Sequence, residues 1–111
     1  MASGRLGKAL LAANTDTTLY TAPAGTVATA TVTLCNSSTS SANVRLAVAT
    51  TATPASADFI EYEFVLGAAG VPGAINILER TGIVLGPGEQ LIVRANASGV
   101  AARAHGFEEP L

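Results

Sequence analysis

The 111-residue chain has little of what soluble proteins usually rely on for surface charge and for chemistry. Charged residues make up 13% of it, whereas an ordinary domain carries about 25%. Aromatic residues make up 5%, tryptophan is absent, and there is one histidine. A free monomer depends on surface charge to stay in solution. We therefore expect part of this surface to be covered by neighbouring molecules.

The single cysteine, Cys35, excludes an internal disulfide framework. A fold held by its core alone suits synthesis in a reducing cytoplasm. The apolar run at residues 9–13 is shorter than the core of a secretory signal. No stretch approaches the roughly 20 apolar residues of a membrane span. We expect neither export by a signal nor insertion into a membrane.

Net charge is −2, from six Lys and Arg against eight Asp and Glu. No basic stripe follows one segment in the way that binding to a phosphate backbone requires. We therefore expect no nucleic-acid partner.

The residues that could act in catalysis lack partners in the sequence. His105 lies near the end of the chain, in an alternating segment that puts Arg103 and Phe107 on the same face. Catalytic triads and dyads need a base beside a nucleophile, and the lone Cys35 has no second thiol to work with. The sequence favours a non-enzymatic protein in which His105 occupies a polar or interface position.

Metal and cofactor sites have equally weak signals. Asp58, Glu61 and Glu63 cluster, but they lack the spacing and the glycine of a calcium loop. Residues 67–73 are rich in glycine but lack the Lys and Ser/Thr of a phosphate-binding loop. We expect charged outward positions and a hairpin loop, with no bound metal or cofactor.

Hydrophobicity alternates with a period of two, which predicts β-strands. The clearest strands are predicted at residues 26–36, 42–49 and 58–66, and weaker ones at 17–21, 75–78, 82–85, 90–95 and 100–107. Turn signals separate them at intervals near ten residues. The fold class expected is all-β: one antiparallel β-sandwich, jelly-roll or immunoglobulin-like, with about seven or eight short strands.

The alternation also predicts which side chains share a face. In the segment 26–36 one face carries Ala28, Ala30, Val32 and Leu34, and in 58–66 one face carries Ile60, Tyr62, Phe64 and Leu66. On this pattern the two tyrosines are expected inward or near corners. Sugar binding by a β-sandwich usually relies on exposed rings that stack, so a carbohydrate-binding role has little support here.

The N-terminal segment is predicted to be an arm at residues 1–15, before a single sandwich domain at 16–111. Residues 6–13 could form a helical turn, an edge strand or part of that arm. Gly4 and Gly7 would permit bends in it.

Several segments resemble small virion structural proteins of tailed bacteriophages. They are Ser3–Gly7, Asn14–Pro23, Phe59–Tyr62, Leu78–Leu85 and His105–Glu109. The resemblance implies a β-sandwich or jelly-roll subunit of the virion, made in the cytoplasm of the host bacterium. The size of the chain is similar to that of capsid decoration, or cement, proteins, which bind the outside of the head shell and brace neighbouring capsomers.

On this resemblance the partner is the major capsid protein or another virion protein, and the chain forms a homo-oligomer, a dimer or trimer. The contacts expected on the arm are Arg5, Leu6, Lys8, Leu10 and Leu11, and those of a second patch are Arg103, His105 and Phe107. Two alternatives remain open. One is a structural component of the tail, neck, baseplate or a fibre, and the other is a carbohydrate-binding module.

Overall fold

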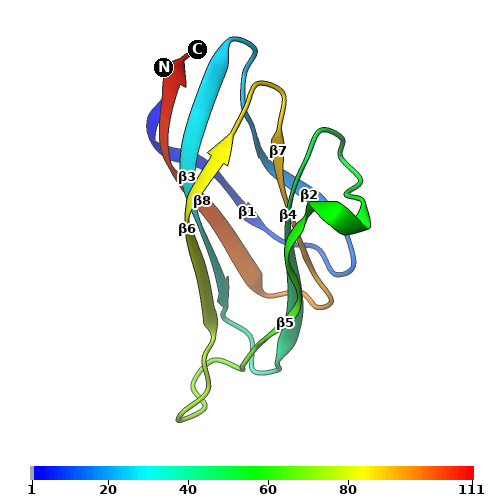
Figure 1. Ribbon diagram of the computed structural model, residues 1–111. Helices are drawn as coiled ribbons and strands as arrows, with labels where there is room; N and C mark the ends of the chain where they lie inside the picture. Colours follow the sequence, from blue (N-terminus) through cyan, green and yellow to red (C-terminus); the bar gives the residue numbers. More distant parts are fainter. Residues whose placement is uncertain (1) are drawn as a thin grey trace.

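The computed structural model describes residues 2–111, which form a sandwich of two antiparallel sheets (Figure 1). The strands are β1 (Ser3–Leu10), β2 (Thr17–Thr21), β3 (Thr26–Asn36), β4 (Ala42–Ala49), β5 (Phe59–Leu66), β6 (Ile77–Leu85), β7 (Gln90–Ala95) and β8 (Val100–Pro110), with a 3-10 turn, η1 (Ser56–Asp58), before β5. The expected all-β sandwich is confirmed. No helix in the described part of the chain is long and apolar enough to cross a membrane.

The strand order distinguishes between the two sandwich types left open by the sequence. Sheet A has the order β1-β8-β3-β6, and sheet B has the order β2-β7-β4-β5. The pairs are nested, because β1 pairs with β8, β2 with β7, β3 with β6, and β4 with β5. The chain is therefore a long hairpin wrapped into two sheets, which is the jelly-roll arrangement. An immunoglobulin-like sandwich has a different strand order.

The core lies between the sheets and follows the predicted alternation of β3. The four residues predicted to share one face of β3 are at most 1% exposed: Ala28, Ala30, Val32 and Leu34. Sheet A also contributes small side chains from β8, including Ala102 and Ala104, whereas leucines and valines dominate the inner face of sheet B. Pairing small residues with large ones across a layer lets the two sheets interdigitate without voids.

A β-bulge in β5 overturns the prediction that four alternating residues share one face. Glu63 has a φ of 56°, and between the pairs Val44–Phe64 and Leu46–Glu61 one residue of β4 opposes two of β5. The extra residue reverses the alternation. Phe64 and Leu66 face the core, whereas Ile60 and Tyr62 are turned out to solvent.

A second bulge joins the two short strands predicted at 75–78 and 82–85 into the single strand β6. Between the pairs Ala30–Ile83 and Val32–Arg80 one residue of β3 opposes two of β6. One of the two is Gly82, whose φ of 70° suits only glycine well. Because of this extra residue, Leu78 and Leu85 both face the core from opposite halves of β6.

The N-terminal segment, expected as an arm, is part of the sandwich over most of its length. Residues 3–10 form the edge strand β1, paired with β8, and Leu11 is 2% exposed in the core. Gly7 lies so close to β2 that an added Cβ would be 2.1 Å from the carbonyl oxygen of Leu19. The two ends of the chain lie side by side (Figure 1), where the Glu108 amide donates to the Ala2 carbonyl. Met1 lies outside the described residues.

Candidate functional site: a basic face on sheet A

The outer face of sheet A carries a group of cations brought together by the β1–β8 pairing. In the register of these strands, Arg5 lies opposite His105 and Lys8 lies opposite Arg103. All four residues are exposed. Leu10 and Phe107 lie on the same face, one at each end of this group. We call the surface of these six residues the basic face: Arg5, Lys8, Leu10, Arg103, His105 and Phe107.

The cations of the basic face differ from the others in having no carboxylate partner. The chain has six Lys and Arg residues. Three form ion pairs, Arg45–Glu63 at 3.1 Å, Arg80–Glu61 at 2.9 Å and Arg94–Asp16 at 3.4 Å. Within residues 2–111 no carboxylate oxygen comes within 4.0 Å of the other three, which all belong to the basic face. The unpaired positive charge is thus concentrated on one side of the molecule.

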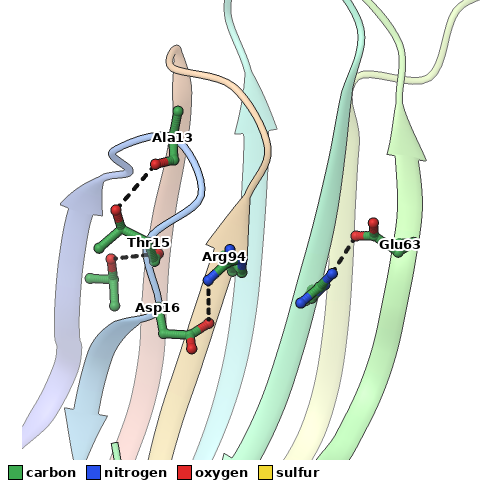
Figure 2. Close-up of polar contacts among 7 residues, drawn as sticks. Ala13, Thr15, Asp16, Glu63 and Arg94 are labelled. Atoms are coloured by element: carbon green, nitrogen blue, oxygen red, sulfur yellow. Dashed lines mark hydrogen bonds and ion pairs between the residues drawn. The ribbon is translucent and has the colours of Figure 1, made fainter. Parts of the chain in front are cut away.

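This arrangement has a local energetic cost. Like charges directly opposite each other on neighbouring strands destabilise a sheet. Sheet B contains a similar pair, since Arg45 lies opposite Arg94, but there Glu63 and Asp16 neutralise the two guanidinium groups (Figure 2). Among the described residues no carboxylate neutralises Lys8 or Arg103 in this way. Departures from a local rule of this kind are expected at functional sites.

A shallow groove of about 350 Å³ runs between these two cations. Lys8 and Arg103 line it together with Leu10 and neighbouring alanines. Leu10 is 73% exposed and Phe107 is 45% exposed. The basic face therefore offers apolar contact area beside its charges. Arginine and aromatic residues, which it contains, are enriched in protein interfaces.

The structure places six of the eight predicted contact residues on this one face. The predicted arm and the predicted second patch are a single surface, because β1 pairs with β8. Leu6 and Leu11 are the exceptions. A register shift between Arg5 and Gly7 turns Leu6 toward the core, and Leu11 is buried there as well. The expectation that these two leucines are surface contacts is corrected accordingly.

A second recess, of about 420 Å³, lies on the outer side of sheet B. Its lining residues are Arg45, Pro54, Ser56, Phe59 and Tyr62. The rings of Phe59 and Tyr62 meet edge to face with centroids 4.9 Å apart, and the Arg45 guanidinium lies 4.5 Å from the centre of the Tyr62 ring. Tyr62 is 59% exposed on this outer side, whereas the alternation led us to expect it inward or near a corner. The bulge at Glu63, which the alternation does not reveal, is the cause.

The other tyrosine joins the two sheets near the chain termini. The Tyr20 hydroxyl donates a hydrogen bond of 2.5 Å to Oε2 of Glu108, whose Oε1 accepts a second bond from the Ala2 amide. Burial of the phenol, together with its bond to Glu108, raises the pKa of Tyr20 well above its ordinary value. The same bond, with the one from Ala2, lowers the pKa of Glu108. This contact holds β8 against β2 and fixes the end of the basic face.

Within the described residues, no group of three or more His, Cys, Asp or Glu side chains is placed to hold a metal ion. Cys35 is a free, half-buried thiol on the outer face of sheet A. Comparison of the chain with models of protein families, with curated proteins and with solved structures finds no match.

Proposed function

We propose that this protein is a non-enzymatic structural component of a phage virion, which binds the outside of the head shell through the basic face and braces neighbouring shell subunits. One observation carries the proposal: all three Lys and Arg side chains without a carboxylate partner gather on one face of the described sandwich. The resemblance of several segments to virion structural proteins of tailed phages supports the same role.

The chemistry of the basic face indicates the kind of surface it would bind. Arg5, Lys8 and Arg103 would pair with carboxylates on the partner, which would remove the like-charge repulsion within the sheet. Such complementarity orients an approaching subunit and speeds its association. Leu10 and Phe107 would supply apolar area, which contributes more to the lifetime of the complex. The partner surface would therefore be acidic in its middle, with apolar contact area at its two ends.

The jelly-roll scaffold suits a bracing role. The cations are on two paired strands, and β8 is held on its other side by eleven register positions along β3. The backbone positions that carry these side chains are thus fixed before binding, which reduces the ordering cost of association.

The copy number of the chain in purified particles tests the proposal. Quantitative mass spectrometry would compare it with the major shell protein of the phage whose genome encodes it. We expect a ratio comparable to that of the shell protein. A few copies in each particle would place the protein in the tail, neck, baseplate or a fibre instead. Absence from the particle would refute the structural role.

The recess on sheet B supports a second candidate, binding of a small carbohydrate. Tyr62 and Phe59 provide exposed aromatic surface, and Arg45 provides donors beside it. A glycan array with the native chain tests this candidate. Specific binding that is lost in Tyr62→Ala but retained in Phe107→Ala, on the basic face, would support it. No binding to any glycan would reject it.

A further inference from the structure

The outer face of sheet A continues beyond the basic face onto β3 and β6. The pairings of the four strands align outward side chains in rows that cross the sheet. One end row contains only apolar residues, and it runs from β1 to β6: Leu10, Ala101, Cys35 and Ile77. The row at the other end places exposed Val84 of β6 in line with Phe107. Exposed hydrophobic side chains that share one face indicate a contact surface.

A charged row lies between these two end rows. It aligns Lys8 and Arg103 with Thr33 of β3 and Glu79 of β6. Neighbouring strands are about 4.8 Å apart, so the backbones of β1 and β6 are separated by about 14 Å. Within residues 2–111 no lysine or arginine nitrogen comes within 4.0 Å of the Glu79 carboxylate. The face therefore has unpaired cations on one side and an unpaired carboxylate on the other.

A strip of threonines along β3 separates the two sides. Thr29, Thr31 and Thr33 are half-buried and alternate along the outer face of the strand. Their hydroxyls make no hydrogen bond within residues 2–111, where the threonine side chains that do so lie at other positions. These hydroxyls can donate to or accept from a partner at a small cost in side-chain entropy.

We infer that the partner of the basic face covers the whole outer face of sheet A, from β1 to β6. This inference rests on the proposed function, because it enlarges the surface proposed there. The basic face occupies only two strands, whereas a standard interface takes about 800 Å² from each partner, and β3 and β6 complete the sheet. The partner would place carboxylates over β1 and β8, polar groups over β3 and a cation over Glu79.

Glu79 gives the interface a direction. A partner turned by half a turn on this face would set its carboxylates against Glu79 and its cation against Lys8 and Arg103. Such juxtaposed like charges disfavour the wrong orientation. Charge also favours a different protein over a second copy of this chain. Two copies stacked on this face would bring together three unpaired cations from each and one Glu79 from each, which leaves an excess of positive charge.

Cosedimentation of Glu79→Gln with shells that lack the protein tests the direction of the interface. If binding followed only attraction of the chain to an acidic shell, this variant would bind more tightly, because it removes a negative charge. We expect a loss of at least about fivefold in affinity, because the cation of the partner loses its carboxylate. Glu63→Gln is the control, since it removes the same charge on sheet B. It should not weaken binding.

Val84→Gln tests the apolar contact on β6 without any change in charge. We expect at least about a fivefold loss of affinity, because the valine is covered by the partner. Val65→Gln is the matched control, because Val65 is 58% exposed on the end strand of sheet B and Val84 is 60% exposed on that of sheet A. It should leave affinity unchanged. Circular dichroism would verify that all four variants are folded.

The outcomes separate this inference from the proposed function. Native affinity in both Glu79→Gln and Val84→Gln, with a loss in Arg103→Glu, would overturn the inference and leave the proposed function in place. Equal losses in Val84→Gln and Val65→Gln would also overturn the inference. So would a dimer of the free chain in sedimentation velocity that Val84→Gln dissociates, since a second copy would then cover this face. A native chain that does not bind shells would refute both proposals.

Discussion

The outer faces of the two sheets differ in whether their opposed cations are neutralised by carboxylates. On each face two cations lie directly opposite each other on neighbouring strands, Lys8 and Arg103 on sheet A, Arg45 and Arg94 on sheet B. On sheet B each arginine has its own carboxylate (Figure 2). On sheet A, within the described residues, neither cation has one.

The cations of sheet B are therefore neutralised within one chain, whereas those of sheet A are left to pair with carboxylates of a partner. The two arginines of sheet B are neutralised within the chain, by Glu63 of β5 and by Asp16 just before β2, and these ion pairs contribute to stability. Those of sheet A are arranged for attraction to something outside the chain, and until it binds they destabilise the strand pair. For charge reversal on sheet A, the comparison predicts that binding weakens while the free energy of unfolding rises.

The largest expected effect comes from detaching the strand that carries half of the basic face. In Gly7→Ala the new Cβ would meet the Leu19 carbonyl oxygen at 2.1 Å, so β1 has to move away from β2. We expect a loss of about 1–3 kcal/mol in the free energy of unfolding, measured by denaturant titration, together with weaker binding to shells. Gly86→Ala is the control, since its Cβ would meet only the flexible Glu89 carboxylate at 3.3 Å. Equal effects of the two variants would argue against a close β1–β2 contact.

Charge reversal on the two faces should affect binding differently. Arg103→Glu removes a cation from the basic face, and we expect at least about a tenfold loss of affinity for shells that lack the protein. Arg94→Glu changes the net charge by the same amount on sheet B and should leave affinity nearly unchanged. Cosedimentation with shells, at low and at high salt, measures both. If the two variants lose affinity equally, binding follows net charge rather than the basic face.

The Tyr20–Glu108 contact predicts a specific pH dependence. Because the folded state lowers the pKa of Glu108 from 4.5, the stabilisation is present above that pH and is lost as the pH falls through the lowered value. Because the pKa of Tyr20 is raised from 10.0, its stabilisation is present below pH 10 and is lost at strongly alkaline pH. Tyr20→Phe should lower the Tm by a few degrees near neutral pH, and the difference from the native chain should narrow in acid. A difference that does not change with pH would contradict this account.

The smallest expected effect is the change in the free energy of unfolding when an arginine on either face is replaced by glutamate. Arg103→Glu places an acidic side chain opposite Lys8 and should raise the free energy of unfolding by a few tenths of a kcal/mol. Arg94→Glu breaks the ion pair with Asp16 and should lower it by up to about 1 kcal/mol. Chemical denaturation with both variants in parallel checks the signs. The same sign for both would contradict the distinction between the faces.

Much of the fold could be predicted from period-two alternation. The limits of β2, β3, β4 and β7 agree with the predicted segments, and the buried face of β3 is the predicted one. The alternation could not reveal β-bulges, because one extra residue leaves the local pattern intact while it reverses the faces beyond it. The outward position of Tyr62 and the continuity of β6 depend on such bulges.

The candidate site was only partly predictable for a related reason. The residues of β1 and β8 are about 100 positions apart in the sequence, so their union into one face depends on the nested jelly-roll pairing. The sequence marks the polar and apolar residues of both segments but not their register. Asn36 shows the same limit. It ends the predicted strand 26–36, but the sequence does not reveal that its buried side-chain amide donates to the carbonyls of Ser40 and Gly67 and fixes the loop after β3.

The central claim, that the basic face is covered by a partner on the particle, can be tested at one residue. Lys8 is the only lysine in the chain, so its acetylation by a water-soluble reagent, followed by mass spectrometry of the peptide that contains it, reports on the basic face directly. Our account predicts that Lys8 reacts readily in the free protein and at least about tenfold more slowly on the particle, because a salt bridge to a shell carboxylate shields its amine. An equal rate in both states would show that the basic face stays open on the particle and would contradict the account.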